Sequence, residues 1–160
     1  MNNIDFKDIT GFIIDDNDIV INKESSSPLI GMYSAFKELN SLDYEKALVL
    51  ACDTPLIKYE VLDLLIKECK TFECCIPKWK DNLLEPLLAI YPIKKAYDTS
   101  QRNIRNNQYK LTKIISAEWK TNFISIEDDI KTLDSDLVSF KNINLIEEIE
   151  ILETNLNKQQ

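Results

Sequence analysis

The clearest candidate for chemistry is Asp53, in the stretch 51–55 (ACDTP). The apolar run before it, residues 46–52, has the length of a strand, and its pattern suits a strand buried on both faces of a parallel sheet. Ligands of such sheets bind outside the carboxyl ends of the strands. A carboxylate at that place is suited to Mg²⁺, which takes oxygen ligands and bridges to phosphates. The structural alternative is that Asp53 and Thr54 cap a following helix.

Two amide side chains form a second candidate site. Asn142 and Asn144 flank Ile143, so in an extended backbone they would face the same side and could hold a phosphate or a metal-bound water. A structural alternative exists here as well, because Asn144 with Glu147 resembles a capping box and Asn142 suits a turn. A third stretch, EPLLAIY, offers only Glu85, for which a solvated strand end is a sufficient explanation.

Composition excludes several other kinds of site. The chain has no histidine, which excludes a histidine-based triad and histidine-ligated metals. Its four cysteines lack CxxC spacing, so neither a zinc motif nor a thioredoxin-type motif is present. The two glycines, Gly11 and Gly31, cannot form a dinucleotide-binding turn or a P-loop.

Charge and hydropathy narrow the class of partner. The net charge of −8 argues against a nucleic-acid partner, whose phosphate backbone favours a basic surface. No apolar run approaches the roughly 20 residues of a membrane span, and the N-terminus does not resemble a secretory signal. We therefore expect a cytoplasmic protein with no membrane or nucleic-acid partner.

The elements expected around these residues alternate between strands and helices, as in the α/β class. A length of 160 residues fits one domain over residues 1–160. Strands are expected at 9–16, 46–52, 72–79, 84–91 and 121–127. Helices are expected from Ser27 and Pro28, from Thr54 and Pro55, around 93–104, briefly at 111–117, and after Asn144. This order predicts a three-layer Rossmann-like fold with a mainly parallel sheet.

Four segments, in this order, resemble the molybdenum-cofactor guanylyltransferases, especially their archaeal-type members. They are SPLIG at 27–31, ACDTP at 51–55, EPLLAIY at 85–91 and FKNIN at 140–144. The resemblance implies a nucleotide-sugar-transferase-like nucleotidyltransferase fold. It also implies the reaction, in which a molybdopterin phosphate attacks the α-phosphate of GTP and pyrophosphate leaves, with Mg²⁺ as the metal cofactor.

The resemblance also implies roles for individual residues. Asp53 matches the Mg²⁺-binding aspartate, and Asn142 and Asn144 match the paired asparagines near the cofactor side, so these three are the expected catalytic residues. The expected nucleotide-side residues are Asp16, with Asp15 as an equal candidate, and Pro28, Leu29 and Gly31.

The sequence departs from the family pattern most clearly at its N-terminal side. The family begins with a strand and a glycine-rich turn, LAGGxSxRxG, followed by a lysine, and these groups wrap and neutralise the nucleotide phosphates. That segment is absent here, so we expect the first βα unit to be lacking and the chain alone to bind GTP poorly. Smaller departures are Ser27 in place of a glycine and Leu145 in place of a frequent threonine.

The sequence leaves more than one function open. The first is a nucleotidyltransferase of this family that works with help from a separate N-terminal chain or is represented here by an incomplete reading frame. The second is a non-catalytic remnant or partner-binding protein that keeps the fold without the phosphate loop, and a third is a guanylyltransferase acting on another phosphorylated cofactor precursor. Self-association is also expected, because a lost strand would leave an exposed sheet edge.

Overall fold

The structure is a computed structural model that describes residues 27–143. Within that range the chain forms two compact units. The first contains residues 27–45 and 93–114, and the second contains residues 46–92 and 115–143. The expected strand at 9–16 and the expected helix after Asn144 lie outside the described residues, and the single domain over 1–160 stays a prediction.

Helix α1 (Pro28–Ser41) opens the first unit and begins as predicted. Ser27 is its N-cap, with an extended backbone and an Oγ that accepts the N–H of Leu29 at 3.3 Å. Pro28 occupies the first helical position, where a missing N–H leaves no hydrogen bond unmade. The buried residues of the helix are Leu29, Ile30, Met32, Ser34 and Phe36.

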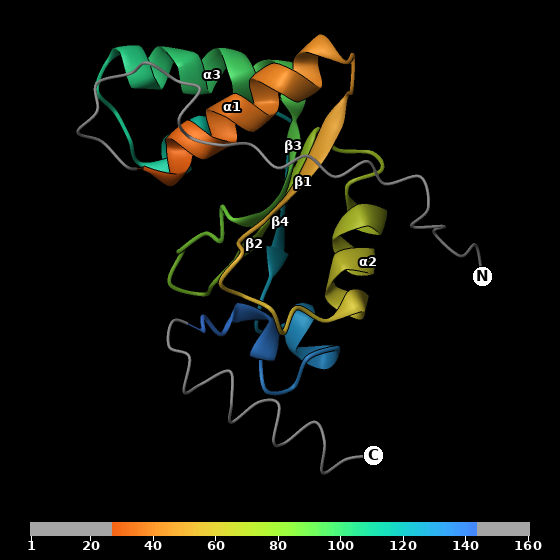
Figure 1. The fold of residues 1–160 in the computed structure, drawn as a ribbon. Helices are drawn as coiled ribbons and strands as arrows, with labels where there is room; N and C mark the ends of the chain where they lie inside the picture. Colours follow the sequence, from red (N-terminus) through yellow and green to blue (C-terminus); the bar gives the residue numbers. More distant parts are fainter. Residues whose placement is uncertain (1–26, 144–160) are drawn as a thin grey trace. The chain divides into compact units, whose positions relative to one another are not determined.

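Helix α3 (Ile93–Arg105) packs along α1 in the same unit (Figure 1). Tyr97 stacks on Tyr33 of α1 with ring centroids 5.5 Å apart, and Gln101 Nε2 donates to both tyrosine hydroxyls. The buried Asn103 donates to the carbonyl of Lys113, which fastens the 3₁₀ helix η3 (Leu111–Ile114) to α3. A short helix was expected at 111–117, and the structure has this shorter 3₁₀ turn.

The second unit contains a sheet of four described strands in the order β1-β3-β2-β4 (Figure 1). These are β1 (Lys46–Leu50), β2 (Cys74–Lys78), β3 (Leu88–Pro92) and β4 (Thr121–Ser125). The β1–β3 and β2–β3 pairs are antiparallel, and the β2–β4 pair is parallel. The α/β class is confirmed, but the prediction of a mainly parallel sheet is wrong. The short connection from β2 to β3 has no room for a crossover, so the chain must return antiparallel.

Strand β1 also differs from its expected environment. The apolar run 46–52 was expected to be buried on both faces of a parallel sheet. Among the described strands β1 pairs only with β3, and its residues are exposed or half-buried. The fully covered strands are β2 and β3, where four of the five residues in each are buried.

Helix α2 (Tyr59–Glu68) lies beside the sheet and supplies one side of the core (Figure 1). Val61 and Leu65 of this helix are fully buried, and burying such a side chain contributes roughly 1.5–3 kcal/mol. Two 3₁₀ helices, η4 (Ile130–Thr132) and η5 (Val138–Phe140), follow β4. One cluster of buried core residues consists of Val61, Leu65, Cys69, Cys75, Leu88, Ile90, Ile124, Ile126 and Ile130. In the stretch from residue 27 to residue 143, no helix has the length and apolar character of a bilayer span.

Candidate active site

Asp53 lies in a turn just beyond the carboxyl end of β1 at Leu50. Thr54 Oγ1 donates to the carbonyl of Ala51 at 3.1 Å and orders this turn. The Asp53 side chain is half-buried, and no residue between 27 and 143 makes a hydrogen bond or ion pair with its carboxylate. The place of Asp53 just after the strand is the one that the sequence suggested.

The structure removes the alternative role of Asp53 and Thr54 as helix caps. Helix α2 begins at Tyr59, and its N-cap is Lys58, which makes no side-chain capping bond. The prediction that this helix opens at Thr54 and Pro55 is therefore wrong. The start is delayed because the backbone N–H of Lys58 donates to Ser139 Oγ, 3.0 Å away, instead of taking part in an earlier helical turn.

The segment that carries the second candidate site meets the Asp53 turn. The backbone N–H of Ile143 donates to the carbonyl oxygen of Asp53 at 2.7 Å. Asn142 is exposed beside this bond, and its amide has no hydrogen-bond partner among residues 27–143. Asn144 lies outside the described residues, so its position stays a prediction. The structure thus brings the Asp53 turn and the Asn142 segment together, although they are far apart in the sequence.

A buried carboxylate, Asp134, contacts the residues that join these two segments. Its Oδ2 accepts the backbone N–H of Ser139 at 2.8 Å, and its Oδ1 lies 3.1 Å from Lys58 Nζ. The Asp134 side chain is 0% exposed, whereas that of Lys58 is 38% exposed. Sequence reasoning missed all three residues, because Lys58 lies far in sequence from the other two and none of the three belongs to a recognisable motif.

The surroundings of Asp134 keep it ionised. Burial alone would raise the pKa of its carboxyl group. The hydrogen bonds from the Ser139 backbone and hydroxyl, with the Lys58 ammonium, outweigh burial and hold the pKa of Asp134 below its usual value. The ion pair with Lys58 is therefore a charged contact at neutral pH.

The third sequence candidate, Glu85, has a structural role. Its Oε1 accepts the indole N–H of Trp79 at 2.6 Å, and its backbone N–H donates to the carbonyl of Pro77. Glu85 is half-buried, so it is not the solvated strand end that the sequence suggested. Trp79 in turn makes an edge contact with Phe140, with ring centroids 5.5 Å apart, so the β2–β3 loop supports the segment that leads to Asn142.

A shallow hollow of about 300 Å³ lies at the carboxyl ends of the parallel strands β2 and β4. Lys78 Nζ lies 5.6 Å from the ring centroid of Phe123, and Lys80 Nζ pairs with Asp128 at 3.2 Å. Lys78 places a positive charge beside this hollow, whereas the charge of Lys80 is paired with Asp128. Asp53 does not line the hollow. Its lining residues are Lys78, Trp79, Lys80, Asn82, Phe123 and Ser125.

The described residues could hold a magnesium ion only together with oxygen ligands from elsewhere, such as substrate phosphates and waters. Between residues 27 and 143, no group of three or more acidic or cysteine side chains lies together in a way that could hold a metal ion. Asp53 offers a single carboxylate. Mg²⁺ is commonly held by one or two carboxylates together with substrate phosphates and waters, so one free carboxylate suits this ion.

Three of the four cysteines are structural residues of the core. Cys69, Cys74 and Cys75 are buried free thiols, and Cys52 is an exposed one. Burial raises the pKa of both Cys74 and Cys75 to about 12. These two thiols therefore stay protonated near neutral pH and are poor nucleophiles.

The other predicted binding residues lie in the first unit or outside the described range. Pro28 is exposed at the start of α1, Leu29 is fully buried, and Gly31 is half-buried in the same helix. Asp16 lies outside the described residues. The nucleotide-binding role of these four residues stays a prediction.

Comparisons with known proteins agree with the fold and with the resemblance. Residues 15–120 match the MobA-like NTP transferase domain family, a range that contains Asp53 and ends before Asn142. A protein of Clostridium perfringens strain 13, named probable molybdenum cofactor guanylyltransferase, is 35% identical over 131 residues, covering 80% of this chain and 62% of that protein. A protein of the same name from Methanosarcina mazei is 27% identical over 133 residues, covering 79% of this chain and 54% of that protein.

A solved structure supports the same conclusion. The molybdopterin-guanine dinucleotide biosynthesis protein A from Archaeoglobus fulgidus is 26% identical with a TM-score of 0.63, covering 84% of this chain and 65% of that one. The chain thus spans little more than half the length of the curated relatives it matches. Since the family match takes in well over half of the sequence, this chain belongs to the MobA-like NTP transferase domain family.

Proposed function

We propose that this chain forms the metal-binding and acceptor-binding part of a Mg²⁺-dependent guanylyltransferase that transfers GMP from GTP to molybdopterin. Family membership and the names of its relatives support this assignment. The observation that carries it is the 2.7 Å bond from the Ile143 N–H to the Asp53 carbonyl. That backbone bond keeps the Asn142 segment beside Asp53, whose side-chain carboxylate has no hydrogen-bond or ion-pair partner among the described residues.

Each site residue has a distinct role in this proposal. Asp53 holds one side of the metal through its free carboxylate, and the substrate phosphates supply further oxygens. Bound Mg²⁺ would supply neutralisation of the phosphate charge in the transition state. Asn142 and Asn144 bind the acceptor through their amides. The family resemblance implies Asp16, Pro28, Leu29 and Gly31 as nucleotide-side residues, with the fully buried Leu29 packing the start of α1 into the core. A cytoplasmic location goes with this activity.

Nucleotide affinity is expected to require a glycine-rich phosphate-binding segment. A chain of net charge −8 does not attract a triphosphate at long range, so binding depends on local N–H groups and cations. Gly31, the one glycine in the described range, lies inside α1, where its backbone is helical. We therefore expect these 160 residues to bind GTP weakly unless a relative's glycine-rich N-terminal segment is supplied as a second chain.

Calorimetry of GTP with Mg²⁺ tests the proposal, with the chain alone and with that segment added. We expect binding only in the mixture, together with transfer of labelled GMP to molybdopterin. Asp53→Asn should abolish both, while Asp43→Asn, which removes an exposed turn carboxylate elsewhere, should change neither. If the mixture shows no binding and no transfer, the result favours a non-catalytic, partner-binding protein. Micromolar binding by the chain alone would show that the added segment is not needed.

A further inference from the structure

The segments 53–58 and 139–143, which we call the site segments, are joined at both ends. At one end the Ile143 N–H donates to the Asp53 carbonyl at 2.7 Å, and at the other the Lys58 N–H donates to Ser139 Oγ at 3.0 Å. Because the first residue of one segment pairs with the last of the other, the two run antiparallel. The second link, from the Lys58 N–H to Ser139 Oγ, uses a side chain as its acceptor. The position of this link therefore depends on the contacts that hold Ser139.

Asp134 holds both partners of the second link. One carboxylate oxygen accepts the Ser139 backbone N–H at 2.8 Å, and the other lies 3.1 Å from Lys58 Nζ. Oδ1 has no hydrogen-bond partner of regular geometry in the described chain, so the Lys58 ammonium is its compensating charge. A fully buried carboxylate is costly without such partners, so replacing it affects both segments together.

The turn between Asp134 and Ser139 is not held by local preference. Leu137 lies within it at φ 50° and ψ 38°, a left-handed conformation that costs a leucine about 1–2 kcal/mol. The Asp134 carboxylate bonds across this turn to the Ser139 N–H. This hydrogen bond therefore helps to hold Leu137 in its unfavourable left-handed conformation. The same bond positions Ser139 to accept the N–H of Lys58.

We propose that Asp134 is the positioning residue of this site: by holding Ser139 and Lys58 it sets how closely the Asn142 segment approaches Asp53. Its meaning for catalysis rests on the proposed function, in which a misplacement of about 1 Å at the reacting groups lowers the rate strongly. The contacts of Asp134 with Ser139 and Lys58 are seen in the structure itself and do not rest on that function.

Amide hydrogen exchange of the folded 160-residue chain, read by NMR, tests the proposal without any activity measurement. In Asp134→Asn the Ile143 amide should exchange roughly tenfold faster or more, while the Cys69 amide at the end of α2 keeps its wild-type rate. Asp136→Asn removes an exposed carboxylate from the same turn and should leave both amides unchanged. An unchanged Ile143 amide, or equal acceleration at Ile143 and Cys69, would overturn the positioning role.

Three further variants keep the test decisive if Asp134→Asn does not fold. Ser139→Ala removes the acceptor of the second link but leaves the buried ion pair, and it should also accelerate exchange at Ile143. Lys58→Met should do the same, whereas Lys58→Arg keeps the charge and should restore a rate near wild type. Wild-type exchange in Ser139→Ala would overturn the proposal. Guanylyl transfer is read separately, so its absence counts against the proposed function alone.

Discussion

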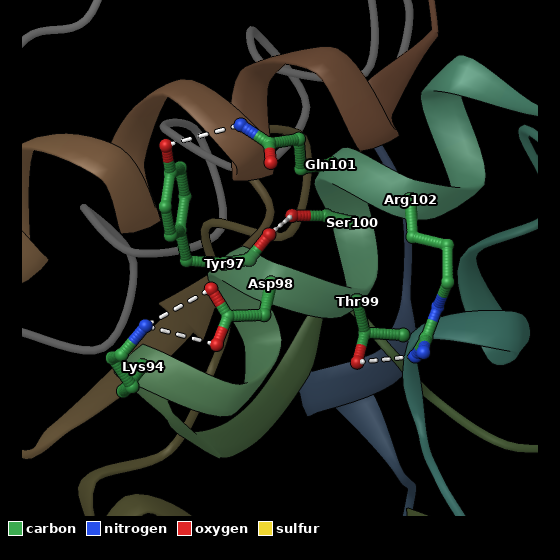
Figure 2. A network of polar contacts seen from close by, with 7 residues as sticks. All are labelled: Lys94, Tyr97, Asp98, Thr99, Ser100, Gln101 and Arg102. Carbon is green, nitrogen blue, oxygen red and sulfur yellow. Dashed lines mark hydrogen bonds and ion pairs between the residues drawn. The ribbon is translucent and has the colours of Figure 1, made fainter.

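The polar contacts on α3 and those around Asp134 are built in opposite ways. On α3 the partners lie within one turn of each other: Lys94 pairs with Asp98 at 2.9 Å, and Arg102 donates to Thr99 at 3.3 Å (Figure 2). Both members of the Lys94–Asp98 pair are more than half exposed. Each such contact lies within a helix that other interactions already form, so it adds only a small amount to the free energy of unfolding.

Asp134 pairs with Ser139 in its own turn and with Lys58 in a segment that is far away in sequence. The Lys58 N–H and Ser139 Oγ are separated by 81 positions, and the carboxylate that holds them is fully buried. Such a contact creates a geometry that neither segment has alone. The comparison teaches that the energetic weight of a polar contact depends on its burial and on the length of the loop it closes, more than on its distance.

The largest effect is expected when the buried contact is broken outright. Asp134→Ala should lower the free energy of unfolding of the second unit by about 3 kcal/mol, because it leaves the Ser139 N–H unpaired and removes the partner of Lys58. The value lies at the low end for a buried pair because Lys58 can reach water. Urea unfolding at pH 7 measures this change. Asp136→Ala is the control, at within about 0.5 kcal/mol of wild type, and equal losses in the two variants would contradict the comparison.

Low pH should remove the contribution of ionised Asp134 to the free energy of unfolding, without any mutation of Ser139 or Lys58. Because the pKa of Asp134 is lowered in the folded state, its ionised form stabilises the fold above the unfolded-state pKa, and this is lost as the pH falls through the folded value. The stability difference between wild type and Asp134→Asn should therefore be full at pH 7 and shrink below about pH 4. Urea titrations of both proteins at several pH values measure it. A difference that stays constant down to pH 2.5 would show that the ionised carboxylate is not what stabilises the turn.

A smaller effect is expected at the start of α1. Ser27→Ala removes the side-chain oxygen that accepts the Leu29 N–H and should cost about 1 kcal/mol. The melting temperature measures this loss. Ser27→Asp retains an acceptor and should lie close to wild type, so a large loss in both variants would point to a role other than capping.

The smallest effect is expected on the exposed face of α3. Asp98→Asn removes the i, i+4 pair with Lys94 and should change the free energy of unfolding by about 0.5 kcal/mol or less. The change should vanish in high salt, which screens exposed charges. A loss as large as that of Asp134→Ala would erase the distinction between the two regions.

The features that local sequence determines were predicted, and those that distant partners determine were not. Ser27 and Pro28 define the start of α1 by themselves, and the strands were located from apolar runs. The start of α2 was misplaced because Lys58 gives its N–H to Ser139. Strand direction was misjudged because an apolar run has the same appearance in parallel and antiparallel sheets. Asp53 and Asn142 were proposed as site residues from their motifs, and their roles stay predictions. Nothing in the sequence near Asp134 shows that Lys58 would reach it.

The bond between Ile143 and Asp53 has a consequence for how the protein is made. The Asp53 turn leaves the ribosome before its partner, which follows several seconds later at about 5–20 residues per second. Closing so long a loop costs entropy that only the finished sheet and helices can offset. A nascent chain that already has β1 and α2 therefore cannot yet present Asn142 beside Asp53, so an incomplete polypeptide lacks this arrangement whatever else it has folded.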